Sequence, residues 1–148
     1  MYHYVECGLS NVWLSNGYQT ENTAYGEVVS IHDVPGLHKA IGMNMIKTRS
    51  SLNADEVRFL RTEMDLSQVQ LAQMLDVAES TVRNWESARV SGIPGPSDRL
   101  LRLLYAEFVE EGTEIRRLIE EISRLNRQVY GSRTYFGEDG GQWHTRAA

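Results

Sequence analysis

The sequence of 148 residues contains one cysteine, three prolines and no long apolar run. A single cysteine, Cys7, excludes an internal disulfide and any cysteine-rich zinc site built from one chain. No apolar segment approaches the ~18 residues of a membrane span. The opening residues, MYHYVECGLSNVW, have neither the basic nor the apolar region of a secretory signal. These absences predict a cytoplasmic protein that has no membrane span.

Positive charge is also scarce. The formal net charge is −5, and residues 51–106 carry six Arg and no Lys against eight Asp and Glu. A uniformly basic DNA-binding surface is therefore excluded. If the chain binds DNA, a few well-placed arginines must make the contacts. Non-specific affinity should then be modest, because it comes from the neutralisation of phosphates.

Residues 1–50 are rich in aromatic and β-branched side chains. The segments YHYVE, NVWLSNGY and YGEVVSIHDV alternate apolar and polar residues, which predicts two or three antiparallel strands. The following PGLHKAIGMNMIKT predicts a helix that starts near Pro35 and has Leu37, Ile41 and Met45 on one side. This module would either bind a partner or support a dimer.

From residue 53 the apolar residues recur at the spacing of an amphipathic helix. Asn53 with Glu56, and Ser67 with Gln70, are two capping-box patterns that open successive helices. After a three-residue break, DVA at 76–78, a third short helix is expected at about 79–86. A fourth helix is expected to begin near Pro96, and a fifth follows Thr113.

The predicted fold class is α+β. A small antiparallel β-rich module with one helix occupies residues 1–50, and an all-α domain of five helices occupies residues 51–130. The Gly-rich tail, residues 131–148, shows no clear period and is expected to be flexible or to become ordered against a partner.

A short helix, a three-residue turn and a second short helix form the geometry of a helix-turn-helix. In ESTVRNWE, Val82 and Trp85 can face inward, while the opposite side carries Glu79, Ser80, Arg83 and Asn84. Asn can pair with adenine and Arg with guanine in the major groove. On spacing alone, two ordinary core helices remain an equal alternative.

Two residues outside this helix are candidate phosphate contacts. Gln68 lies in the first turn of the preceding helix, where free backbone N–H groups could help to hold a phosphate. Arg89 lies just past the candidate recognition helix. The complete candidate set for DNA contact is Gln68, Glu79, Ser80, Thr81, Arg83, Asn84 and Arg89.

The stretch LSQVQLAQMLDVAESTVRNWESARVSGIPGPSDRLLRLL resembles the Xre/Cro-type helix-turn-helix domain over about residues 53–105. The elements LSQ, LA, L-x-V and TV-x-x-WE occur in register. A β-rich module before the domain is similar to the order of parts in MqsA-type antitoxins. The resemblance implies a homodimeric repressor that binds double-stranded DNA at a palindromic operator, often its own promoter. It also implies a basic toxin protein as a partner; the alternative is a stand-alone or phage-type repressor.

The resemblance also assigns residues. Gln68 matches the phosphate-contacting Gln of LSQ, while Arg61 and Glu86 match a structural Arg–Glu pair that links the first and third helices of the domain. The chain departs from the family at Asp76, where Gly is usual, and at Ala78, where a Ser or Thr cap is usual. It also lacks the four zinc-binding cysteines of MqsA-type modules.

An apolar stripe on the fifth helix of the domain is the candidate dimerisation surface. It could pack on its own chain or pair with its mate across a two-fold axis, and the dimer is the preferred interpretation; its residues are Ile115, Leu118, Ile119, Ile122 and Leu125.

A metal site or an enzyme is the third class of function that the sequence allows. His3, Cys7, His32 and His38 have loose spacings for a zinc site, so neither a metal nor another cofactor is predicted. No nucleophile–base motif, Gly-rich phosphate loop or pair of carboxylates in a recognisable frame indicates catalysis.

Overall fold

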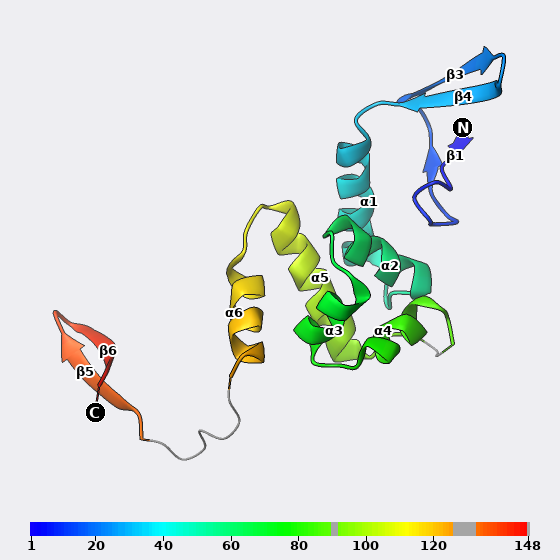
Figure 1. The fold of residues 1–148 in the computed structure, drawn as a ribbon. Coiled ribbons are helices and arrows are strands. Elements are labelled where there is room, and N and C mark those ends of the chain that lie inside the picture. The colour runs from blue at the N-terminus through cyan, green and yellow to red at the C-terminus, as the bar shows by residue number, and fades with distance from the viewer. Residues whose placement is uncertain (90–91, 126–132, 148) are drawn as a thin grey trace.

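The structure is a computed structural model that describes residues 1–89, 92–125 and 133–147. Strand pairs lie toward both ends of the chain, and six helices lie between them, so the described residues form an α+β fold (Figure 1). No described helix is long and apolar enough to cross a membrane.

The N-terminal strands form two separate antiparallel pairs. Strand β1 (Tyr2–His3) pairs with β2 (Trp13–Leu14), and β3 (Tyr18–Thr23) pairs with β4 (Gly26–Ile31). The sequence predicted two or three strands, and the structure has four. The predicted segments contain β1, β2 and β4. Strand β3 was missed, because its residues YQTENT are mostly polar and exposed and show no apolar alternation.

Helix α1 (Val34–Thr48) follows these strands. The side chain of Asp33 caps it by accepting a hydrogen bond from the backbone N–H of Gly36 at 3.2 Å. Gly42 lets α1 approach α5 closely, because a Cβ atom at this position would lie 2.1 Å from the Tyr105 hydroxyl oxygen. Tyr105 is almost fully buried there, and burial raises its pKa to about 12.

The next three helices are α2 (Ala54–Glu63), α3 (Gln68–Leu75) and α4 (Glu79–Glu86). Both predicted capping boxes form, because Asn53 exchanges hydrogen bonds with Glu56, and Ser67 does so with Gln70. Helices α5 (Gly95–Val109) and α6 (Glu114–Ser123) complete the helical part. Helix α5 begins at Gly95, one residue before the expected Pro96. Pro94 is its N-cap residue and has a non-helical backbone, with ψ 147°.

One apolar core joins the helices. Its least exposed members come from α2, α3, α4 and α5, and Leu9 and Met45 from the first 50 residues belong to the same core. A buried ion pair on α5 strengthens this connection. Asp98 accepts a hydrogen bond from the backbone N–H of Leu52 at 2.8 Å, and Arg102 donates to the backbone carbonyl of Arg49 at 2.6 Å. The N-terminal module and the helical domain are therefore packed together.

The described part of the tail contains a hairpin where the sequence predicted no regular structure. Strand β5 (Tyr135–Asp139) pairs with β6 (Gln142–Arg146) around Gly140 and Gly141. Both glycines have positive φ, 61° and 80°, as a two-residue type I′ turn requires. The Gly140-Gly141 pair therefore marks the turn between β5 and β6.

Candidate nucleic-acid interface

Helix α4 has one buried and one exposed side. Val82 and Trp85 are 0% and 4% exposed, and both belong to the apolar core. Glu79, Ser80 and Arg83 are exposed, whereas Thr81 and Asn84 are half-buried. The helix is thus anchored by apolar contacts and presents polar side chains outward, which is the division that a recognition helix needs.

The turn between α3 and α4 retains its geometry despite both departures from the family pattern. Asp76 ends α3 in the left-handed region, with φ 54° and ψ 47°. Asp tolerates this conformation better than most residues other than glycine, so the turn can form without a glycine. Ala78 has the extended backbone of an N-cap, but its side chain makes no capping hydrogen bond.

Arg61 and Glu86 form a bidentate ion pair across α2 and α4. Arg61 Nε donates to Glu86 Oε2 at 2.7 Å, and Arg61 Nη2 donates to Oε1 at 2.8 Å. The remaining nitrogen, Nη1, donates to the backbone carbonyl of Leu66 at 2.8 Å. The Glu86 side chain is only 1% exposed. The Arg61 guanidinium therefore ties α2, the α2–α3 turn and the Glu86 carboxylate of α4 together.

Gln68 joins the same network. Its amide nitrogen Nε2 lies 3.3 Å from Oε1 of Glu86, so the Gln68 side chain is oriented against the end of α4. Gln68 is also the first residue of α3, where backbone N–H groups have no partner within the helix. The structure thus places this side chain beside the candidate recognition helix.

Arg58 is a candidate that sequence reasoning missed. Its Nη2 donates to the backbone carbonyl of Glu86 at 3.0 Å, and its side chain remains 55% exposed. The only available signal was its position one helical turn before Arg61 on α2. A cation near the carboxyl end of α4 is favourable for the helix dipole, and its exposed guanidinium could also reach a phosphate.

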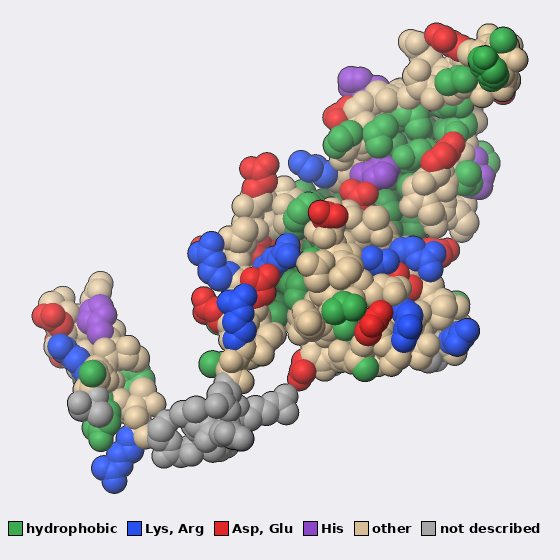
Figure 2. Space-filling model, in the orientation of Figure 1, with side chains coloured by type: hydrophobic (Ala, Val, Ile, Leu, Met, Phe, Trp, Pro, Cys, Tyr) green, Lys and Arg blue, Asp and Glu red, His purple; other side chains and the backbone are tan. Residues whose placement is uncertain are grey.

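Arg89 is exposed and follows the end of α4. Figure 2 shows basic side chains, all of them Arg, over the part of the surface formed by α2 and α4, with acidic side chains among them. The positive charge is local, as the net charge of −5 requires.

The candidate dimerisation stripe on α6 is divided between two environments. Ile115 and Ile119 pack against the chain's own core. Leu118, Ile122 and Leu125 are 57%, 54% and 70% exposed. The inner pair therefore packs on its own chain, and the outer three are exposed. Ile122 and Leu125 also line a depression between α3 and α6 of the same chain.

The four residues considered for zinc have other neighbours or face solvent. His3 stacks on Trp13, the Cys7 thiol donates to the carbonyl of Tyr4, and His38 lies between Tyr4 and Glu63. His32 is exposed. Within residues 1–89, 92–125 and 133–147, no group of three or more His, Cys, Asp or Glu is placed to hold a metal ion.

Comparison with known proteins gives one match. A protein-family model described as Helix-turn-helix matches residues 57–101, which extend from α2 into α5. Neither the curated proteins nor the solved structures gave a match. The family match supports a DNA-binding transcriptional regulator. Together with the geometry of α2, α3 and α4, it shows that residues 57–101 form a helix-turn-helix domain of the Xre/Cro type.

Proposed function

We propose that this protein is a cytoplasmic repressor that binds a palindromic operator in double-stranded DNA as a homodimer, with α4 in the major groove. The observation that carries the proposal is the two-sided character of α4. Val82 and Trp85 hold its inner side, while Arg83 and its polar neighbours face outward. Arg83 and Asn84 would contact bases, with Glu79, Ser80 and Thr81 beside them.

Gln68 and Arg89 would contact the phosphates on either side of the groove, and Arg58 adds a third candidate. Gln68 and Arg58 are both held by Glu86, at its side chain and its backbone carbonyl respectively. Their positions relative to α4 are therefore set by the same residue. Because so few cations are available, loss of one phosphate contact should reduce affinity for all DNA sequences and lower the salt dependence.

A palindromic operator requires a protein with two-fold symmetry, which a homodimer provides. A palindrome needs two copies of α4 about 34 Å apart, or a multiple of that distance. Leu118, Ile122 and Leu125 form an exposed apolar surface on α6 that a second copy could cover. The glutamate variants Leu118→Glu and Ile122→Glu should give monomers in sedimentation, whereas Arg117→Glu, on an exposed part of the same helix, should not. A dimer that persists in both apolar variants would contradict this surface.

The operator is expected in the DNA upstream of the protein's own gene, which would make the repressor autoregulatory. A gel-shift titration of that upstream region at low salt tests the function directly. We expect one specific complex that resists competition by unrelated DNA. Failure to shift any palindrome in that region would contradict the proposal.

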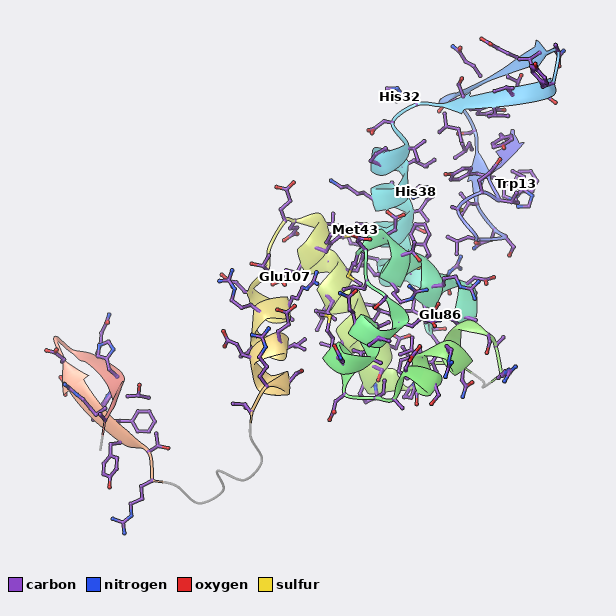
Figure 3. The ribbon with its side chains drawn as sticks, in the orientation of Figure 1. Trp13, His32, His38, Met43, Glu86 and Glu107 are labelled. Carbon is purple, nitrogen blue, oxygen red and sulfur yellow. The ribbon has the colours of Figure 1, made fainter. Side chains whose placement is uncertain are left out.

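An antitoxin role in a toxin–antitoxin pair is the second candidate. Residues 1–38 contain four acidic residues, Glu6, Glu21, Glu27 and Asp33, and no Lys or Arg. The same module exposes Trp13 and Tyr25, with Trp13 labelled in Figure 3. An acidic surface with exposed aromatic rings suits a basic protein partner. The alternative is that the module only supports the repressor's own fold or dimer.

The two alternatives differ in a simple experiment. The chain would be co-expressed with any small basic protein encoded beside it, and the two would be purified through a tag on the basic protein. An antitoxin should co-purify at a fixed stoichiometry, and Trp13→Asp should weaken the complex without changing operator binding. A chain that remains separate from such a neighbour would be a stand-alone repressor.

A further inference from the structure

A cavity of about 390 Å³ lies at the junction of α1, α3, α5 and α6. None of the residues proposed above for DNA or dimer contact lines it. Its floor consists of buried apolar side chains, namely Met64, Leu66, Met74 and Leu104. The ring of Phe108, which is 41% exposed, lines one side. An apolar depression of this size is in the range of small-molecule sites.

The charges around the rim are balanced, and two of the four charged residues are already engaged with the protein. Glu107 accepts hydrogen bonds from the backbone N–H groups of Ile115 and Arg116, at 2.8 and 3.3 Å (Figure 3). Arg116 in turn pairs with Glu120 at 3.1 Å. The remaining charged residues of the rim, Lys39 and Glu111, have opposite signs. A charged molecule would therefore meet no excess of opposite charge.

The turn between α5 and α6 lines this cavity through Glu111, Gly112 and Thr113. Glu111 adopts a left-handed conformation with φ 61°, which is strained for a residue other than glycine. Gly112 follows, and a Cβ atom there would lie 2.9 Å from Glu107 Cγ. Helix α6 begins immediately afterwards, held by the carboxylate of Glu107. A strained turn with close contacts therefore forms the mouth of the cavity.

We infer that this cavity binds a small, neutral and mostly apolar molecule. The apolar floor supplies the favourable burial, at about 25 cal/mol per Å² removed from water. Met64 and Met74 have flexible thioether side chains that can adapt to different apolar shapes. A bound molecule would contact Met74 of the helix-turn-helix and Arg116 of α6 at the same time. The site therefore joins the DNA-binding helices to the helix that bears the exposed apolar stripe.

The test is a titration of the full chain with the neutral fluorescent probe N-phenyl-1-naphthylamine. We expect a saturable rise in fluorescence with one probe bound per chain. Thr113→Trp places an indole at the cavity mouth and should weaken binding at least tenfold. Thr113 is exposed and its side chain makes no capping hydrogen bond to α6; its hydroxyl oxygen accepts one long hydrogen bond, from Arg117 Nη2 at 3.5 Å, which the control variant also removes. The matched control is Arg117→Trp, on the same helix but outside the cavity, which should bind the probe like the wild type.

Three results would overturn the inference. The first is fluorescence that rises without saturation, and the second is equal affinity in the two tryptophan variants when circular dichroism shows both to be folded. The third concerns the chemical class. Lys39→Glu should change the affinity for the neutral probe by less than twofold, and a tenfold change would show that charge governs the site. The titration contains no DNA, so its outcome is independent of the proposed repressor function.

Discussion

The helices and the β-hairpins differ in how far their apolar side chains are buried. Leu71 on α3 is fully buried, whereas Val28 on β4 is 50% exposed. The helices share one core that also includes Leu9 and Met45. In the hairpins β3–β4 and β5–β6, no residue is fully buried. An isolated two-stranded hairpin is marginal in water, so these hairpins contribute little to the stability of the chain. The helical core supplies the stability, and the hairpins supply exposed surface.

The largest effect is expected where the helical core contains a buried charge. Glu86→Ala leaves Arg61 without its carboxylate partner, and it should lower the free energy of unfolding by about 3–5 kcal/mol. Urea denaturation measures the change. Glu120→Ala breaks the exposed pair with Arg116 and should have an effect of only about 0.3–0.5 kcal/mol. Equal effects would mean that the buried network does not hold the helix-turn-helix together.

A smaller effect tests whether α1 belongs to the core. Gly42→Ala would bring a Cβ atom against the ring of Tyr105, and it should destabilise the chain by about 1–3 kcal/mol. Gly95→Ala is the control, because a Cβ atom there meets nothing within 4 Å. Thermal unfolding of both variants would decide the point. If Gly42→Ala unfolds like Gly95→Ala, then α1 does not pack closely on α5 in solution.

The smallest effect is expected in the hairpin. Val28→Ser should change the free energy of unfolding by less than about 0.5 kcal/mol, because the side chain is half exposed and lies outside the core. Leu71→Ala, in the core, should cost about 2–5 kcal/mol in the same denaturation experiment. A large loss for Val28→Ser would show that the hairpin is covered in solution, by a second copy or by another part of the chain.

The sequence predicted most of the helical region because its signals are local. The boxes at Asn53 and Ser67 lie three residues from their partners, and both form. Helix α4 has the expected bounds, and it ends after Glu86, where Ala88 adopts a left-handed conformation with φ 58°. The pairing of Arg61 with Glu86, 25 residues apart, came from family resemblance, and no periodicity indicates it.

Local sequence patterns could not predict the contacts between residues that are far apart in the chain. Nothing near Arg102 in the sequence indicates that it donates to the carbonyl of Arg49, 53 residues away. Arg58 was missed for the same reason, since its partner is a backbone carbonyl at the far end of α4. The stripe on α6 was recognised, but periodicity cannot show which members face the core. Only the tertiary structure separates Ile115 and Ile119 from Leu118, Ile122 and Leu125.

The proposed DNA recognition depends most on the outward side of α4, and operator binding by Arg83→Ala tests this role most directly. Fluorescence anisotropy would measure the affinity of wild type, Arg83→Ala and Arg117→Ala for the upstream region and for unrelated DNA. Both arginines are exposed, so neither substitution should alter the fold. Arg83→Ala should reduce the difference in binding free energy between operator and unrelated DNA by about 1–3 kcal/mol per half-site. Arg117→Ala should bind both DNAs like the wild type. Wild-type specificity in a folded Arg83→Ala protein would contradict the assignment of α4 as the recognition helix.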